Sequence, residues 1–209
     1  MKTKKTNIYT PVVLAAAAAI GLAGCANTAD SATVMIDAEY ASYQSTQQLV
    51  DDSDLIITGE VLSTTSELQY PEISDDPDPQ RNPQAGVTLS EKDLEELAIP
   101  ILVTKIRVTE VISGAVSAGE IIEVSQVGGI KDGVNYVEPD TVPLSDLEGE
   151  NVVLALKAHE DAPYDLVSDK YAIMLLNEQG KISAAKSESG EISSIPLASK
   201  LEEITELVN

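Results

Sequence analysis

The sequence predicts a mainly β fold with some helix (α+β): a small antiparallel barrel or sandwich with a short N-terminal and a C-terminal helix. Three observations predict it. Runs rich in Ile, Val and Thr either alternate with polar residues or are continuously apolar, which is typical of half-buried and fully buried strands. Turn-forming residues separate these runs. Apolar residues at helical spacing occur near both ends of the part that follows residue 38.

The first 24 residues have the layout of a secretory signal. Lys2, Lys4 and Lys5 precede an apolar stretch that runs from Val12 to Ala23. This stretch of about 12 apolar residues is shorter than the roughly 20 that a membrane-spanning helix needs. The sequence therefore predicts export rather than a permanent anchor helix.

Residues 22–25, Leu-Ala-Gly-Cys, are similar to the lipobox of bacterial lipoproteins. The resemblance implies that Cys25 is lipidated, that residues 1–24 are removed as a signal peptide, and that lipid on Cys25 holds the chain to a bacterial membrane. The chain would then be attached to the outer face of the cell membrane, or to the outer membrane of a bacterium that has two membranes. Ala26 stands where an Asp would retain a lipoprotein at the inner membrane. The alternative is an ordinary signal or transmembrane segment with an incidental cysteine.

The mature chain is expected to begin with a tether and a short helix. Residues 25–38 comprise the cysteine and a small, polar stretch, which predicts a flexible tether ahead of a single β-rich domain at 39–209. Four residues within 39–54 have helical spacing and predict the N-terminal helix: Tyr40, Tyr43, Gln47 and Val50.

Strands are expected in several segments that follow. They are residues 54–65, 100–113, 120–127, 151–157, 171–177 and 178–185. Gly59 suggests a bulge in the first of them. The alternation in 100–113 and 120–127 places Ile106 and Val108 inward, and Ile122 and Val124 likewise, so these two strands are predicted to form a hairpin. The segments 151–157 and 171–177 are continuously apolar and are predicted to be buried on both faces. A last hairpin is suggested around residues 186–190.

Two long connections and a C-terminal helix complete the prediction. Residues 69–99 contain four prolines from Pro71 to Pro83, which exclude regular structure there, followed by a short helix that Ser90 is expected to cap. Residues 128–150 form the second connection. Leu197, Leu201, Ile204 and Val208 share one face of a helix in 196–209. Long loops at the rim of a barrel are frequent binding sites.

Residues 54–185 resemble small exported bacterial domains with an oligonucleotide/oligosaccharide-binding-like (OB-like) barrel, distantly similar to netrin-like modules. The resemblance is carried by the segments "SDLIITGEV", "TKIRVTEVISG", "GEIIEVSQVGG", "LEGENVVLALK" and "YAIMLLNEQGKIS". The resemblance implies a small OB-like barrel, and it rests on the pattern of these segments without a signature motif.

Composition excludes several classes of partner. The chain has 13 basic and 35 acidic residues, and loss of residues 1–24 leaves a balance of about −25. Such a domain repels nucleic acid and anionic lipid headgroups, so no nucleic-acid partner is expected. Aromatic residues make up 3% of the chain, so the core must consist of Ile, Val, Leu and Ala.

The sequence offers no catalytic constellation and no metal motif. His159 is the single histidine, no "GxSxG" occurs, and the single cysteine, Cys25, is expected to be lipidated. "HEDAP" departs from the zinc motif "HExxH" at Pro163. We therefore expect His159 to be a loop residue and predict no catalytic residue, no metal ligand and no cofactor.

Three further groups of residues have an alternative, functional interpretation. The acidic pairs Glu95–Glu96 and Glu202–Glu203 are expected by chance in so acidic a chain. Asp75, Asp76 and Asp78 offer hard oxygen ligands for Ca²⁺ but lack the spacing of a calcium loop, so a solvated acidic loop is expected. Three tyrosines could form a contact patch if they shared one rim, although scattered positions are expected: Tyr70, Tyr136 and Tyr164.

The function that these observations favour is that of a lipid-anchored extracytoplasmic module without enzymatic activity. It would bind an unknown protein or a ligand of the cell envelope. One alternative is a carboxylate-based hydrolase of the envelope, which needs two converging carboxylates and a strongly raised carboxyl pKa. Another is a small solute-binding accessory lipoprotein.

Overall fold

The computed structural model describes residues 32–71, 73, 76, 78, 80–82, 85–190 and 192–208. The predicted signal, Cys25 and the first part of the tether therefore lie outside the described residues. The elements are β1 (Thr33–Met35), α1 (Thr46–Asp51), β2 (Leu55–Gln69), α2 (Glu91–Leu97), β3 (Ile99–Ser113), β4 (Ile121–Val127), β5 (Gly129–Lys131), β6 (Val134–Val137), the 3-10 helix η1 (Leu144–Leu147), β7 (Asn151–Lys157), β8 (Tyr164–Leu166), β9 (Ile173–Leu176), β10 (Ile182–Ala184) and α3 (Leu201–Val208).

Five strands close into a barrel. β2 pairs antiparallel with β3 and β7, β3 pairs antiparallel with β4, β4 runs parallel to β8, and β8 pairs antiparallel with β7. β9 and β10 extend the sheet beyond β7. The predicted small barrel with terminal helices is confirmed, and a five-stranded ring is the architecture of OB-like domains. The pair of β4 with β8, which is the one parallel pair among these five strands, closes the ring.

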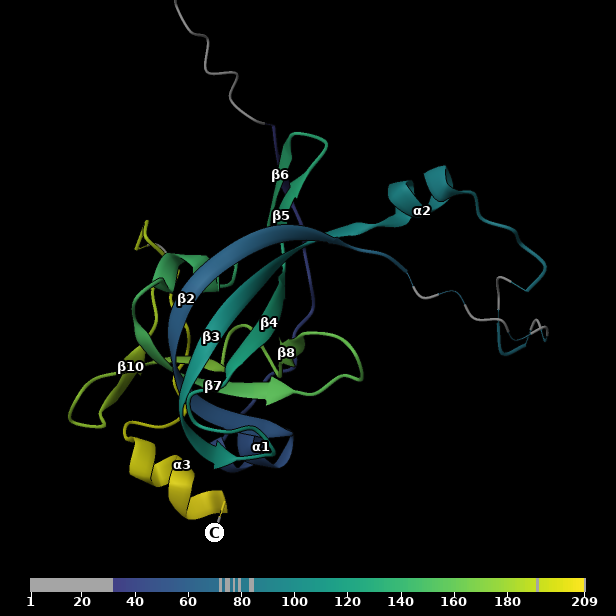
Figure 1. Cartoon of the computed structure of the whole chain (residues 1–209). Coiled ribbons are helices and arrows are strands. Elements are labelled where there is room, and N and C mark those ends of the chain that lie inside the picture. The colour runs from purple at the N-terminus through teal and green to yellow at the C-terminus, as the bar shows by residue number, and fades with distance from the viewer. Residues whose placement is uncertain are drawn as a thin grey trace, which may run out of the picture. The chain divides into compact units, whose positions relative to one another are not determined.

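The two long strands β2 and β3 curve around the barrel and continue past it toward α2 (Figure 1). Their pairing slips between Thr58 and Gly59, as the predicted bulge requires. A Cβ on Gly59 would collide with the Ile106 side chain, so only glycine fits this close approach of β3. α2 begins with the expected capping box: Ser90 Oγ accepts from the Asp93 amide at 3.2 Å, and the Asp93 carboxylate accepts from the Ser90 amide at 2.8 Å.

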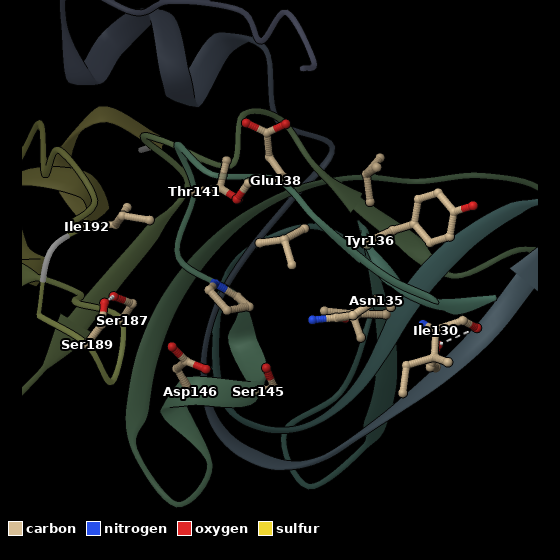
Figure 2. Close-up of a pocket in the computed structure, with 17 residues that line it drawn as sticks. Ile130, Asn135, Tyr136, Glu138, Thr141, Ser145, Asp146, Ser187, Ser189 and Ile192 are labelled. Carbon is tan, nitrogen blue, oxygen red and sulfur yellow. Dashed lines mark hydrogen bonds between the residues drawn. The ribbon is translucent and has the colours of Figure 1, made fainter. Parts of the chain in front are cut away.

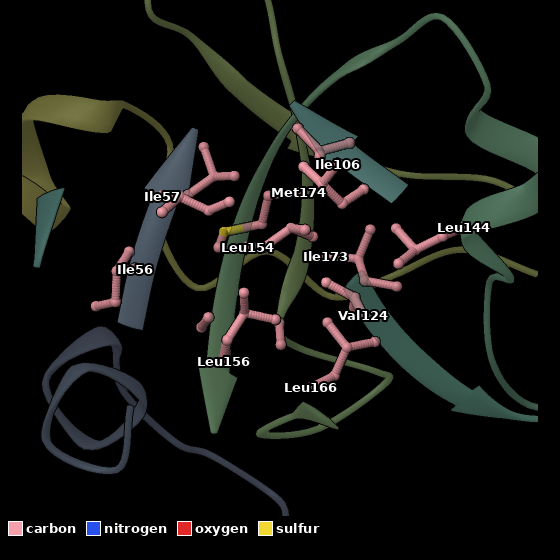
Figure 3. Close-up of a cluster of buried hydrophobic side chains, with 14 of the residues drawn as sticks. Ile56, Ile57, Ile106, Val124, Leu144, Leu154, Leu156, Leu166, Ile173 and Met174 are labelled. Carbon is pink, nitrogen blue, oxygen red and sulfur yellow. The ribbon is translucent and has the colours of Figure 1, made fainter. Parts of the chain in front are cut away.

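The core lies inside the ring and against β9 and β10. Aliphatic side chains from seven of the strands and from η1 contribute to it, and Figure 3 shows part of this cluster. The alternation predicted for β3 and β4 is confirmed, since Ile106, Val108, Ile122 and Val124 are buried while Lys105 and Glu123 are exposed. β7 is buried along its length from residue 152 to 156. Its continuous apolar run was the signal for a strand covered on both faces.

Helices α1 and α3 lie together at the end of the barrel opposite β5 and β6 (Figure 1). The Thr46 hydroxyl of α1 donates to the Leu197 carbonyl at 2.7 Å, so α1 is joined to the segment that leads into α3. Ile204 is the buried residue of α3. Within the described residues, neither these helices nor α2 combine the length and the hydropathy that crossing a bilayer requires.

The predicted N-terminal helix is shorter than expected, because Tyr40 and Tyr43 precede it. Ser45 caps α1 by accepting from the Gln48 amide at 3.3 Å. Tyr43 instead packs its ring edge-on against Tyr171 and donates its hydroxyl to Asp52 at 2.6 Å. Tertiary contacts, rather than helical periodicity, therefore place these two tyrosines.

Residues expected in irregular segments form a second, three-stranded sheet. The connection 128–150 contains the hairpin β5–β6 and η1, and Thr33–Met35 of the expected tether pairs in parallel with β6. The interpretation of these stretches as irregular was wrong at those positions. The suggested last hairpin is reduced to one isolated bridge between Lys186 and Ser193.

Candidate ligand-binding site

A pocket of about 420 Å³ opens between the hairpin β5–β6 and the end of the barrel (Figure 2). Its floor is formed by Leu102 of β3 and by Val127 to Gly129, where β4 passes into β5. One wall is the hairpin. The opposite wall consists of η1 and of loop residues that follow β10, namely Ser187, Ser189 and Ile192. A concave, largely apolar space of this size with a few polar groups is typical of a small-molecule site.

The hairpin wall depends on local turn chemistry. Asp132 and Gly133 both have positive φ, 53° and 76°, as the two central residues of a tight hairpin turn require. Gly129 has φ 114°, and a Cβ there would collide with Ser66 Oγ, which accepts from the Ile130 amide at 2.7 Å. Lys131 Nζ donates to the Ala98 carbonyl at 2.7 Å and so joins the hairpin to the end of α2.

The buried side-chain amide of Gln126 holds the opposite wall in place. Gln126 accepts from the Leu144 amide at 2.7 Å and donates to the Val142 carbonyl at 3.2 Å and to Asp169 at 2.7 Å. These bonds attach the start of η1 to β4. Asp146 Oδ2 then accepts from the Glu188 amide at 2.8 Å, which attaches the loop to η1.

The lining of this pocket has a marked charge bias. Its polar side chains are an amide, hydroxyls and the carboxylates of Glu138 and Asp146, and none of the lining residues is Lys, Arg or His. Glu138 is almost fully buried, and its carboxylate accepts from the Ala38 amide at 3.1 Å and the Asp140 amide at 3.3 Å. The pocket therefore offers apolar contacts, neutral hydrogen-bonding groups and two carboxylates, and none of its lining residues is a cationic partner for an anion.

A smaller pocket of about 200 Å³ contains two carboxylates, Asp165 and Asp169, together with Tyr40. Burial raises the pKa of the Asp169 carboxyl to about 6, and repulsion from Glu138 and Asp165 adds to the shift, while the hydrogen bond from Gln126 opposes it. Burial, followed by the charge of Asp169, raises the pKa of the Tyr40 phenol.

We expect the buried Asp169 carboxyl to make the protein less stable as the pH rises from about 4 to 6. Its pKa is near 6 when folded and near 3.8 when unfolded, so the folded state binds more protons in this window. The unfolding free energy should fall by up to about 3 kcal/mol across it because of this group. Asp169→Asn should remove that part of the pH dependence, measured by urea unfolding at pH 4 to 7.

Asp140→Asn is the matched control for this measurement, because the Asp140 side chain is 70% exposed and pairs with Lys170 at the surface. It should leave the pH dependence unchanged. Equal slopes for the wild type and Asp169→Asn would contradict the expectation.

His159, Asp165 and Ser125 lie together, but in an order that does not support nucleophilic catalysis. Asp165 is in the middle: its Oδ2 lies 2.8 Å from His159 Nε2, and its Oδ1 accepts a short hydrogen bond from the Ser125 hydroxyl. In a serine triad the imidazole stands between the hydroxyl and the carboxylate. His159 is in the loop between β7 and β8, as predicted, and about half exposed.

The other residues singled out in the sequence do not converge. Asp76 and Asp78 pair with Arg81 Nε at 3.1 and 3.5 Å, while Asp75 and Cys25 lie outside the described residues. Within the part of the chain that is described, no three His, Cys, Asp or Glu residues are grouped to hold a metal ion. Glu95 and Glu96 of α2 line one pocket together with Lys92 and Lys131. Three tyrosines line three different pockets: Tyr70, Tyr136 and Tyr164.

A scan against protein-family models and a search of curated proteins both found no match to this chain. The fold and the two pockets therefore carry the functional argument.

Proposed function

We propose that the chain is a lipid-anchored extracytoplasmic lipoprotein whose barrel domain is a non-enzymatic binding module of the cell envelope. The lipobox-like residues 22–25 support the anchor at Cys25. Two acyl chains on one cysteine suffice for stable attachment, at about 0.8 kcal/mol per buried methylene. The strongly acidic composition supports a ligand other than nucleic acid.

The observation that carries the binding role is the 420 Å³ pocket beside the hairpin β5–β6. Its apolar floor and its hydroxyl and carboxylate groups can hold a ligand without reacting with it. A small solute-binding accessory lipoprotein would use the same pocket, so this alternative differs in its partner and not in its site.

The pocket is tested by filling it. The Asn135 side chain points into the pocket, whereas the ring of the adjacent Tyr136 points away from it (Figure 2). Asn135→Trp should therefore weaken binding of the neutral dye N-phenyl-1-naphthylamine by at least about tenfold, or 1.4 kcal/mol. Tyr70→Trp, the matched control at an exposed position that does not line this pocket, should bind it like the wild type.

The readout is dye fluorescence in a titration of residues 26–209. The chain has no tryptophan, so each variant also introduces a single donor for energy transfer to the dye. A wild type that shows no saturable binding, or equal binding by both variants, would refute a ligand site in this pocket.

A second candidate function, a carboxylate-based hydrolase, is favoured by one observation. Asp165 and Asp169 line one pocket, and the pKa of Asp169 is raised to about 6. Against it, each carboxylate already accepts hydrogen bonds from within the protein, Asp169 from Gln126 and Asp165 from Ser125. Release of soluble fragments from purified cell walls by the wild type but not by Asp169→Asn would support the hydrolase instead of the binding module.

A further inference from the structure

We propose that the pocket beside the hairpin β5–β6 selects small amphiphilic cations: ligands with an apolar body that ends in an ammonium group. The inference rests on the proposed binding function of this pocket and adds the chemical class of its ligand. It follows from how apolar and acidic groups are distributed along the pocket.

The end of the pocket at the hairpin is apolar. Ile130 and Val137 lie on the same face of the hairpin. Ile130 pairs with Asn135, and Asn135 and Val137 are two positions apart on β6, so their side chains share one face. Met35 pairs with Val137 and lies on this face as well. Ile130 is 61% exposed and Met35 is 76% exposed. Leu102 and Val127 continue this apolar surface into the pocket floor. An aliphatic or aromatic body that covers these side chains would remove exposed apolar area from water.

The other end is polar and acidic. Ser145 and Asp146 of η1 face Ser187 and Ser189 of the loop across this end (Figure 2). The hydrogen bond from the Glu188 amide to Asp146 Oδ2 fixes the orientation of the carboxylate, and Asp146 forms no ion pair with any residue in the described part. An ammonium group has three donors, which this carboxylate and the nearby hydroxyls can accept.

Charge also excludes the opposite class of amphiphile. A fatty acid or an anionic lipid would place its charged head near the Asp146 carboxylate with no lining cation beside it. Repulsion between like charges and the loss of hydration of the head both oppose this binding. Glu138 adds a second carboxylate to the wall. The formal net charge of −22 raises the concentration of organic cations near the surface as well.

Three probes of equal chain length test the selection: octylammonium, octanol and octanoate, each titrated below its micellar concentration by calorimetry at low salt. The wild type should bind octylammonium at least about tenfold more tightly than octanoate and severalfold more tightly than octanol. Asp146→Asn, which keeps an oxygen for the Glu188 amide, should lower the octylammonium affinity to that of octanol and leave octanol binding unchanged.

Glu123→Gln is the matched control, because it removes one negative charge from β4 outside this pocket. It should preserve the order of the three probes. Octanol binding as tightly as octylammonium, or unchanged octylammonium binding by Asp146→Asn, would overturn the charge selection while the binding function stands. Failure of all three probes to bind the wild type would overturn the binding function itself.

Discussion

Leu154→Asp is expected to leave the domain largely unfolded at neutral pH. Leu154 is fully buried on β7, between its partners Ile57 of β2 and Ile173 of β9. Truncating a buried leucine costs about 2–5 kcal/mol, and the aspartate adds an unpaired charge in an apolar site. Because domains of this size are stable by about 5–15 kcal/mol, the combined loss is comparable to the total. Circular dichroism and urea unfolding measure the outcome.

Glu123→Lys is the matched control for charge placement. Glu123 is on the exposed side of β4, half exposed, and lies 3.8 Å from Lys105. Loss of such a surface pair should change stability by about 0.5 kcal/mol or less. Similar melting temperatures for Leu154→Asp and Glu123→Lys would contradict the central position of β7.

Cys25→Ser is expected to abolish lipidation of the chain. If Cys25 carries the lipid, the serine variant keeps almost the same size and the same apolar stretch but has no thiol to acylate. It should retain its uncleaved signal or be shed into the medium, and it should incorporate no labelled palmitate. The wild type should incorporate palmitate and sediment with membranes.

The alternative of a spanning anchor helix predicts that both proteins stay in the membrane, uncleaved and unlabelled. Mass measurement of the N-terminal peptide of the wild type separates the two cases. A peptide that begins at Met1, or an unmodified Cys25, would refute the lipoprotein assignment.

Local patterns in the sequence were sufficient for four of the five barrel strands, whereas β8, which closes the ring, lies outside every segment predicted as a strand. The alternation around Ile106 and the continuous apolar run around Leu154 each report burial that is decided by a residue and its near neighbours. The capping box at Ser90 is likewise contained within four residues. Such signals predict an element and its inward face, whatever the rest of the chain does.

The candidate site was harder to predict because its parts come together through long-range pairing. Asp132–Gly133 is a strong turn signal that could have revealed the hairpin β5–β6, although the strands beside it are only three and four residues long. No local pattern indicates that Thr33 pairs in parallel with Asn135, about a hundred positions later. Gln126, which positions η1 beside the pocket, stands at an inward position of the alternation that Ile122 and Val124 define. A polar residue there was a signal that the pattern offered, although it does not identify the partners of the amide.

The pairing of β1 with β6 also determines how the domain would carry a mechanical load. All three residues of β1 are exposed, so main-chain bonds such as Asn135 N to Ala32 O at 2.8 Å hold it, at about 0.5–1.5 kcal/mol each. A pull from an anchor upstream would load these bonds before it loaded the barrel. Release up to Ala38, whose amide donates to Glu138, would lengthen the tether by about 23 Å at about 3.3 Å per residue.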